Sequence, residues 1–205
     1  MNQVDVPSPI NLQEEGDAKK WERSAMQRPF RRDFIEAFGN ELQIINRPSL
    51  KVLELGSGPG FLACELLMRF NDLEITLLDY SIPMHELAKK RIGANVSRVK
   101  FVNRNFKQAE WPSGLGTYGV VITNQAVHEL RHKRHAFALH EYVKSLIKVG
   151  GVYLVCDHFY GQGGMSDDQL YMSVEEQRQC LVLAGFKVRK ILEKGSLVLH
   201  RATRL

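Results

Sequence analysis

The stretch Val52-Leu-Glu-Leu-Gly56-Ser-Gly58-Pro-Gly60 decides the fold of this chain, because a short apolar run leads directly into three alternating glycines. Residues 61–70 then carry apolar side chains at helical spacing. Glycine adopts backbone dihedrals that a Cβ forbids, and it lets a ligand approach the main chain closely. A strand, a glycine-rich turn and a helix in this order predict a ligand site at the carboxyl end of a parallel sheet.

Short apolar runs alternate with helical patterns through the rest of the chain. Further strands are predicted at residues 74–79, 98–102, 118–123, 151–156, 186–192 and 196–200, and further helices at residues 83–92, 137–147 and 174–183. Only Glu193-Lys-Gly195 separates the last two strands, so we expect them to form a hairpin with one antiparallel strand. The alternation predicts an α/β fold with a parallel sheet built from βαβ units.

The N-terminal region shows a different pattern. The first dozen residues are polar and contain two prolines, which predicts a loose tail. Residues 14–46 have a helical pattern, and Gly39-Asn40 is a point at which this region could divide into two helices. Three phenylalanines, Phe30, Phe34 and Phe38, fall on one helical stripe. We expect residues 1–46 to form a separate N-terminal region, and residues 47–205 to form a single globular domain.

Composition excludes several classes of protein. The chain has 205 residues, of which 44% are hydrophobic and 25% are charged, and these values suit one soluble domain. No apolar run approaches the length needed to span a bilayer, and the first residues lack the pattern of a signal peptide. Three cysteines, Cys64, Cys156 and Cys180, lie far apart in apolar segments, which suits reduced thiols. We expect a cytoplasmic protein that has no membrane partner.

The net charge of +5 permits an anionic partner but does not require one. Basic residues are spread along the chain, and only Arg131-His-Lys-Arg-His135 forms a dense cluster. A cluster this short is more often a solvated loop than a nucleic-acid site, so we do not expect a nucleic-acid partner.

The glycine loop matches neither of the common phosphate-binding motifs. A dinucleotide fingerprint needs its third glycine one residue later, where this chain has Phe61, and a P-loop needs a lysine and a hydroxyl after its last glycine. The loop instead resembles the first motif of class I S-adenosylmethionine-dependent methyltransferases, and the resemblance extends over about residues 50–205. Asp79-Tyr-Ser-Ile-Pro-Met84 is similar to a D-x-S-x-x-M segment of that family. Within the superfamily, the pattern is most similar to small-molecule methyltransferases such as those of the ubiquinone and menaquinone pathway.

The resemblance implies a doubly wound, mostly parallel seven-stranded α/β sheet, with an antiparallel strand near the C-terminus and helices added at the N-terminus. It also implies S-adenosylmethionine as the cofactor. Asp79, at the end of the second strand, would hold the ribose hydroxyls, because a carboxylate can accept two hydroxyl hydrogen bonds. Glu54 would lie near the amino group of the cofactor. The other implied cofactor contacts are Gly56, Ser57, Gly58 and Gly60 in the loop, Tyr80, Asn105 and Phe106 beside the ribose or adenine, and Asn124 and Gln125 near the methionine end. Asn105 departs from the family, which often has an acid at this position.

Methyl transfer mainly requires that the acceptor atom be held behind the sulfonium methyl group. A base is needed only when the acceptor arrives protonated. His128 follows the fourth predicted strand, and Asp157 and His158 follow the fifth. Histidine titrates near neutral pH. We therefore predict that His128 or His158 is the catalytic base and that Asp157 orients or polarises its neighbour.

The N-terminal helices are expected to cover the acceptor pocket, because members of this family often place a helical lid there. Trp21 and the three phenylalanines would supply its aromatic surface. Three arginines would be available to a carboxylate or phosphate on the acceptor: Arg28, Arg31 and Arg32.

His128-Glu-Leu-Arg-His132 also matches H-E-x-x-H, the signature of zinc peptidases. On one helix the two histidines would share a face, and Glu129 could activate a water molecule. This interpretation leaves the glycine loop and Asp79 without a role, and a motif with three specified positions also arises by chance. We therefore expect no metal, and a zinc metallopeptidase is the distant alternative.

Taken together, the motifs predict an S-adenosylmethionine-dependent methyltransferase that acts on an oxygen, nitrogen or carbon atom of a small molecule. A nucleic-acid or protein methyltransferase is the alternative, although no N/D-P-P-Y segment follows the fourth strand. A cofactor-binding regulator without catalysis would share the same motifs.

Overall fold

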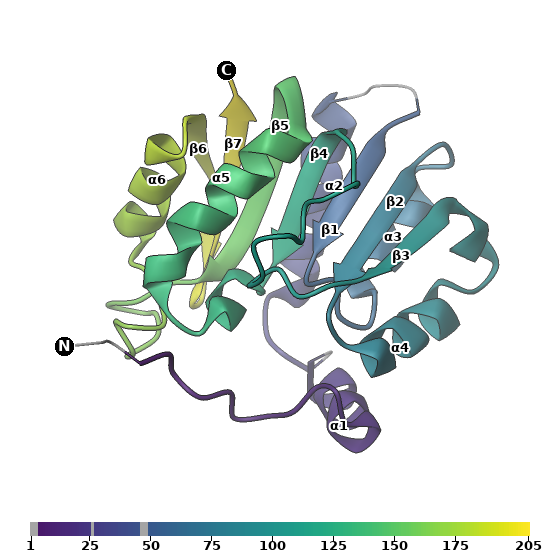
Figure 1. Ribbon diagram of the computed structural model, residues 1–205, viewed down its shortest axis with the longest axis horizontal. Coiled ribbons are helices and arrows are strands. Elements are labelled where there is room, and N and C mark those ends of the chain that lie inside the picture. Colours follow the sequence, from purple (N-terminus) through teal and green to yellow (C-terminus); the bar gives the residue numbers. More distant parts are fainter. Residues whose placement is uncertain (1–3, 26, 46–48) are drawn as a thin grey trace.

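The structure, a computed structural model, describes residues 4–25, 27–45 and 49–205. Within these residues, seven strands form one sheet that helices cover on both faces (Figure 1). The strands are β1 (Lys51–Leu55), β2 (Glu74–Asp79), β3 (Val99–Asn103), β4 (Tyr118–Asn124), β5 (Ile147–His158), β6 (Phe186–Lys194) and β7 (Leu197–Arg204). The helices are α1 (Glu15–Ala25), α2 (Arg31–Ile45), α3 (Phe61–Arg69), α4 (Ile82–Ile92), α5 (Ala136–Leu146) and α6 (Val174–Leu183), with 3₁₀ turns η1 (Gly93–Arg98), η2 (Val127–Leu130) and η3 (Lys133–His135).

The strand order is β3-β2-β1-β4-β5-β7-β6. Strands β1 to β5 pair in parallel, and β7 lies antiparallel between β5 and β6. The predicted doubly wound, mostly parallel sheet with an antiparallel strand near the C-terminus is therefore confirmed. The strand order reverses between β1 and β4, so the carboxyl ends of these two strands flank the crevice in which open α/β sheets bind ligands.

Two hydrophobic layers join the helices to the sheet. One layer lies against α2, α3 and α4 and includes Phe34, Leu66 and Ala88. The other lies against α5 and α6 and includes Leu139 and Leu181. In Figure 1, α5 crosses in front of the sheet, while α2 and α3 lie behind it. The buried sheet is a rigid scaffold that holds the loops at its carboxyl edge in place.

The N-terminal helices divide at a different place from the one predicted. α1 ends at Ala25 and α2 begins at Arg31, so the break does not lie at Gly39-Asn40. Pro29 disfavours helical conformation at the residue before it, which accounts for the observed break. Gly39 lies inside α2, where a Cβ would come within 2.4 Å of Arg69 Nη1. A Cβ at this position would therefore have to displace the flexible Arg69 side chain of α3.

The predicted phenylalanine stripe is also corrected. Phe34 and Phe38 are fully buried in the core of the sheet, so they do not supply surface to a ligand pocket. Phe30 precedes α2 with a φ of 65°, and it is 38% exposed. Helix α2 is therefore part of the core, which leaves α1 and the turn after it to cover a ligand.

Residues 4–14, which we call the N-terminal strap, are docked instead of loose. Val6 N donates to Arg131 O at 2.8 Å. The Arg131 guanidinium donates to the carbonyl oxygens of Val6 and Pro7 at 3.0 and 2.7 Å, and Gln13 Nε2 donates to Tyr80 O at 2.7 Å. Figure 1 shows the strap running along the carboxyl edge of the sheet to α1. The predicted loose tail is therefore wrong for this described part of the segment.

The described helices include none that is both long and apolar enough to cross a membrane. Cys64, Cys156 and Cys180 are free thiols. The predicted boundary between residues 46 and 47 lies outside the described residues, so the division into a lid and a domain stays a prediction.

Candidate active site

The glycine loop forms the turn between β1 and α3. Gly56, Gly58 and Gly60 have φ values of 64°, 52° and 72°, which side chains rarely adopt. A Cβ on Gly56 would lie 2.4 Å from the Cβ of Ala126, and one on Gly60 would lie 2.9 Å from the Cβ of Ala88. Gly56 therefore lets the loop approach the end of β4, and Gly60 lets α3 approach α4.

A cavity of about 690 Å³, which we call the central cavity, lies beside this loop. Its volume is typical of small-ligand sites. The predicted cofactor residues that line it are Glu54, Gly56, Ser57, Gly58, Asp79, Tyr80, Phe106, Asn124 and Gln125. Gly60 and Asn105 are not lining residues: Gly60 packs on α4, and Asn105 Oδ1 accepts from Lys107 N at 3.0 Å. The cavity thus brings together all but two of the predicted cofactor residues.

Asp79 ends β2, and backbone amides fix its carboxylate. Oδ2 accepts from Gly58 N at 2.8 Å, and Oδ1 accepts from Ser81 N at 2.9 Å. Ser81 is the N-cap of α4, because its hydroxyl accepts from Met84 N at 3.2 Å. Burial raises the pKa of Asp79, and the two amide hydrogen bonds oppose this rise. Each carboxylate oxygen keeps a second lone pair for a ligand hydroxyl.

Several buried polar atoms on the lining residues have no hydrogen-bond partner within the described part of the chain. They are Glu54 Oε2, Ser57 Oγ, Asn124 Oδ1, Gln125 Oε1 and Arg31 Nη2. Burial and the nearby charge of Asp79 raise the pKa of Glu54 to about 8. Buried polar atoms in folded proteins normally have partners, so this cluster indicates a polar ligand.

Gln125, which also lines the central cavity, has a strained backbone. It has a φ of 57° although it is not a glycine, and its amide donates to Cys156 O at 2.8 Å. Backbone strain of this kind is concentrated at functional sites. The turn after β4 is therefore held against the end of β5 in a shape that presents the Gln125 side chain to the cavity.

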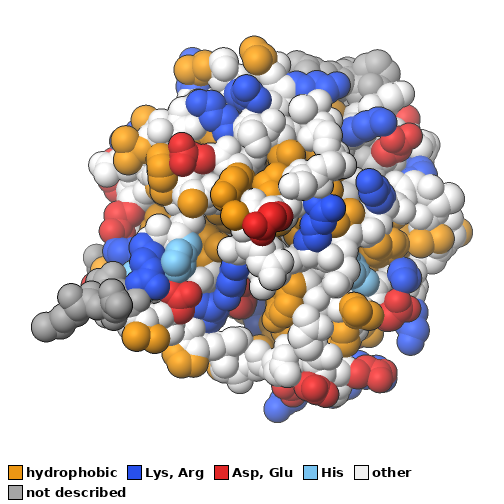
Figure 2. Space-filling view, in the orientation of Figure 1, with side chains coloured by type: hydrophobic (Ala, Val, Ile, Leu, Met, Phe, Trp, Pro, Cys, Tyr) orange, Lys and Arg blue, Asp and Glu red, His pale blue; other side chains and the backbone are white. Residues whose placement is uncertain are grey.

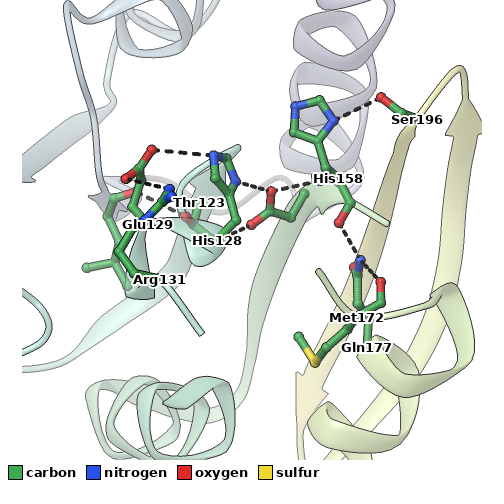
Figure 3. Close-up of polar contacts among 10 residues, drawn as sticks. Thr123, His128, Glu129, Arg131, His158, Met172, Gln177 and Ser196 are labelled. Atoms are coloured by element: carbon green, nitrogen blue, oxygen red, sulfur yellow. Dashed lines mark hydrogen bonds and ion pairs between the residues drawn. The ribbon is translucent and has the colours of Figure 1, made fainter. Parts of the chain in front are cut away.

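His128 and Asp157 form a buried ion pair where β4 and β5 end (Figure 3). His128 Nδ1 lies 2.6 Å from Asp157 Oδ1, and His128 N donates to Asp157 Oδ2 at 2.8 Å. Burial opposes a charge on His128, but Asp157 and Glu129 outweigh burial and raise the pKa of His128 to about 10. Burial also acts to raise the pKa of Asp157, yet the positive charge of His128 leaves it lowered. His128 is therefore a cation at neutral pH and cannot take up a further proton.

His158, at the end of β5, lies in a different electrostatic environment. Its Nδ1 is 2.9 Å from Ser196 Oγ (Figure 3), and its ring centroid is 5.6 Å from that of His128. Burial lowers the pKa of His158, Asp157 opposes this effect, and the charges of His128 and Arg28 add to it. His158 is therefore neutral at pH 7. When Nδ1 donates to Ser196, Nε2 carries the lone pair that can accept a proton.

The H-E-x-x-H residues do not form the helical arrangement that a zinc peptidase needs. Val127–Leu130 is a 3₁₀ turn, and Arg131 follows it with a φ of 67°. His128 pairs with Asp157, whereas His132 Nδ1 accepts from Arg134 N at 3.1 Å. The described residues contain no group of three or more potential metal ligands. The geometry of this segment therefore does not support the peptidase alternative.

Sequence reasoning missed three parts of the site. Ser196 lies in the turn between β6 and β7, which the antiparallel pairing places beside the end of β5. The Tyr171 ring centroid lies 5.6 Å from that of His128 and 5.9 Å from that of His158. The strap lines the cavity with Pro9, Ile10 and Leu12. The hairpin predicted from the short interval between the last two strands could have placed Ser196 near the site. Neither Tyr171 nor the strap has a comparable local pattern in the sequence.

Comparison with known proteins agrees with this geometry. Residues 52–151 match a family model described as "Methyltransferase domain". Nearly half of the chain is therefore similar to a methyltransferase domain. The family and fold predicted from the glycine loop are thereby confirmed.

The names of three proteins that this chain resembles state O-methylation or N-methylation. Malonyl-[acyl-carrier protein] O-methyltransferase of Legionella pneumophila is 31% identical over 87 residues, which are 42% of this chain and 30% of that protein. An O-methyltransferase family protein from Burkholderia thailandensis has a TM-score of 0.76 at 21% identity, over 94% of this chain and 61% of that chain. A glycopeptide N-methyltransferase complexed with S-adenosylmethionine has a TM-score of 0.64 at 18% identity, over 82% of this chain and 93% of that chain. The solved structures establish the fold. The chain spans less than a third of the length of the curated relative.

Proposed function

We propose that this methyltransferase domain transfers a methyl group from S-adenosylmethionine to a small-molecule acceptor. The observation that carries the proposal is the central cavity, which joins all but two of the predicted cofactor residues to His128 and His158 in one space. The relatives support the proposal, because two are O-methyltransferases by name and the third is an N-methyltransferase complexed with S-adenosylmethionine.

The lining residues fit this cofactor. Asp79 would accept hydrogen bonds from the ribose hydroxyls, and Glu54 would hold the cationic amino group. Tyr80 and Phe106 would flank the ribose or adenine. When bound, the cofactor supplies a reactive sulfonium methyl group. The orphaned oxygens described above would gain the partners that they lack within the chain.

His158 is the base in this proposal when the acceptor carries a proton. Its neutral imidazole lines the cavity, and Ser196 fixes the orientation of the ring. His128 has a separate role, because it is already protonated. Its positive charge helps to keep the pKa of His158 low, and it would stabilise negative charge that develops on the acceptor. Asp157 holds His128 in this state.

The alternative acceptors, nucleic acid and protein, gain no support from the dense basic cluster at residues 131–135. Arg131 binds the strap, and Lys133 pairs with Glu176 at 2.7 Å. Arg134 and His135 both pair with Asp5, at 2.5 and 2.9 Å. Figure 2 shows basic and acidic side chains interspersed over one face of the molecule. The cluster is therefore engaged within the chain, which favours a small acceptor.

Calorimetric titration with S-adenosylmethionine and S-adenosylhomocysteine, with NAD as the control, tests the cofactor. We expect micromolar binding of both sulfur ligands and no binding of NAD. Absence of binding to either sulfur ligand would refute the proposal.

A His158→Ala variant tests the base, with Tyr160→Ala as the matched control. Tyr160 lies just after the end of β5, but it does not line the central cavity. With a hydroxyl acceptor found by screening against radiolabelled S-adenosylmethionine, we expect His158→Ala to lower kcat by roughly 100-fold or more. The wild-type rate should fall with decreasing pH only below the ordinary histidine pKa of 6.5, because the pKa of His158 is lowered. Unchanged turnover in His158→Ala would remove this residue from the mechanism.

A further inference from the structure

A chain of charged contacts joins the His128–Asp157 ion pair to the N-terminal strap, and Glu129 lies at its centre (Figure 3). His128 contacts Asp157 through Nδ1, and its Nε2 lies 3.5 Å from Glu129 Oε1. Glu129 Oε2 lies 3.6 Å from Arg131 Nη1, and Arg131 Nη2 donates to Pro7 O at 2.7 Å. Each carboxylate oxygen of Glu129 therefore faces a different cation, one in the buried ion pair and one that holds the strap.

The backbone after β4 explains why three residues so close in sequence contact one another. Glu129 N donates to Ala126 O at 3.0 Å, and Arg131 N donates to His128 O at 3.0 Å, as in a 3₁₀ turn. Arg131 then adopts a φ of 67°, and strain of this kind at a residue other than glycine is concentrated at functional sites. His128, Glu129 and Arg131 all line the central cavity. A ligand that enters the cavity therefore meets this cluster.

The cluster is partly shielded from water, so salt screens its charges less than it would at the surface. The side chains of His128, Asp157 and Arg131 are 14%, 6% and 9% exposed, and that of Glu129 is 36% exposed. Burial acts to raise the pKa of Glu129, and the charge of Asp157 adds to this effect. The cations His128 and Arg131 outweigh both and leave the pKa of Glu129 lowered. Glu129 is therefore ionised at neutral pH.

A histidine ring that is held at one nitrogen can still swing about that contact. Asp157 holds Nδ1 of His128, and among the described residues the polar contact of Nε2 is with Glu129. The rings of His158 and Tyr171 lie beside the His128 ring, each with a centroid distance of 5.6 Å. Glu129 therefore supplies the second point that fixes the orientation of this ring, and orientation of groups around a reacting centre matters for rate.

We propose that Glu129 is a positioning residue, which fixes the His128 ring and links it to the docked strap through Arg131. The inference deepens the proposed function and rests on it, because His128 stabilises developing negative charge there. A strap that undocks would free the Arg131 side chain from the carbonyl oxygens of Val6 and Pro7. Glu129 could then follow Arg131 away from His128. The ring is therefore held at both nitrogens only while the strap is docked, so the closed roof of the cavity and the oriented His128 occur together.

Glu129→Gln tests this link in the ligand-free chain, because it removes the charge and keeps the size of the side chain. Glu86→Gln is the matched control, since Glu86 pairs with Lys89 at 2.7 Å on α4 and does not line the cavity. NMR of isotope-labelled histidine follows the titration of His128, whose pKa is about 10 in the wild type. We expect Glu129→Gln to lower this pKa by about one unit, as loss of a nearby opposite charge predicts. Glu129→Asp keeps the charge on a shorter side chain and should give a smaller shift in the same direction. Glu86→Gln should cause no shift.

Amide hydrogen exchange measures the other end of the link. Glu129→Gln should speed exchange in the strap by roughly two- to fivefold, because Arg131 loses an ion pair and keeps its two contacts with backbone carbonyls. Val6 is the most direct reporter, since its amide donates to Arg131 O. Glu86→Gln should leave exchange in the strap unchanged.

The outcomes separate this inference from the proposed function. An unchanged His128 titration in Glu129→Gln would overturn the inference, and a shifted titration with unchanged exchange in the strap would overturn the link to the roof. Neither measurement uses a ligand, so a failure of the wild type to bind S-adenosylmethionine and S-adenosylhomocysteine would refute the proposed function alone. If Glu129→Gln fails to fold, which its amide spectrum shows, Glu129→Asp replaces it in both measurements.

Discussion

The floor and the roof of the central cavity are built in different ways. The floor consists of the glycine loop and the ends of β1, β2 and β4, and paired strands and left-handed glycines determine its shape. The roof consists of the N-terminal strap and the turn after α1. Side chains hold it to backbone carbonyls, as in the hydrogen bonds from Arg131 to Val6 and from Gln13 to Tyr80.

This difference determines how each part responds to change. Because the main chain determines the shape of the floor, some of its glycine positions do not tolerate the methyl group that a substitution by alanine adds. A roof held by several separate side-chain bonds can lose one of them and keep the others. We therefore expect the floor to determine which ligand groups are bound and the roof to determine how quickly they enter and leave.

Gly56→Ala tests the floor and should have the largest effect. The new Cβ would meet Ala126 at 2.4 Å on a backbone with a φ of 64°. We expect the free energy of unfolding to fall by about 2–4 kcal/mol in urea titrations, from overpacking and left-handed strain together. Binding of S-adenosylhomocysteine should be lost.

Gly116→Ala is the matched control for this change. Gly116 also has a positive φ, of 77°, but a Cβ there would have nothing within 4 Å. The left-handed backbone alone should cost about 1 kcal/mol, and ligand binding should be retained. Equal losses in the two variants would show that the contact with Ala126 does not shape the floor.

The pH dependence of ligand binding tests the role of Glu54 in the floor of the central cavity. In the ligand-free protein the pKa of Glu54 is raised to about 8, so its carboxyl group is protonated at pH 7. A ligand ammonium group favours the ionised form, and binding must then release a proton. The affinity for S-adenosylhomocysteine should therefore rise with pH, by up to about tenfold per unit, and level off above about pH 8.

Glu54→Gln should bind S-adenosylhomocysteine more weakly and without this pH dependence. The affinity for 5′-methylthioadenosine should not change with pH over this range in either protein, since that ligand has no ammonium group. Calorimetry between pH 6 and 9 measures all four combinations. A parallel pH dependence for both ligands would show that a group other than Glu54 is titrating.

Arg131→Met tests the roof and should have the smallest effect. It removes the hydrogen bonds to Val6 O and Pro7 O and leaves the bond from Val6 N to Arg131 O. We expect a loss of about 1 kcal/mol or less in the free energy of unfolding. Amide hydrogen exchange in residues 4–14 should be faster, while the affinity for S-adenosylhomocysteine should change by less than about fivefold.

Lys187→Met, at an exposed position on β6, is the control for Arg131→Met. It should leave hydrogen exchange in the strap unchanged. If Arg131→Met also left this exchange unchanged, the Arg131 side chain would not hold the roof in place.

The floor could be predicted from the sequence because its signals are local. β1 and β2 lie at the predicted residues, since each is an apolar run that ends at a glycine or an aspartate. The predicted break at Gly39-Asn40 was wrong, because α2 continues through both residues and the Arg69 side chain lies beside Gly39. β5 extends beyond the predicted 151–156, since Ile147 pairs with Tyr118 across a register shift.

The roof could not be predicted, since its contacts join distant parts of the sequence. Arg131 and Val6 are 125 positions apart, and no pattern near either residue marks the pair. The choice between His128 and His158 likewise depended on geometry. Asp157 directly precedes His158 and follows His128 by 29 positions, and only the folded structure shows that its side chain pairs with the His128 ring.

The docked strap also bears on how this protein should be handled in the laboratory. An affinity tag fused ahead of the strap would precede Asp5 by only a few residues, and Asp5 contacts Arg134 and His135. A run of tag histidines at that place could compete for the same partners and perturb ligand titrations. β7 runs antiparallel to β5, so the C-terminus leaves the sheet at the opposite edge (Figure 1). A tag placed there keeps purification chemistry away from the site that is to be measured.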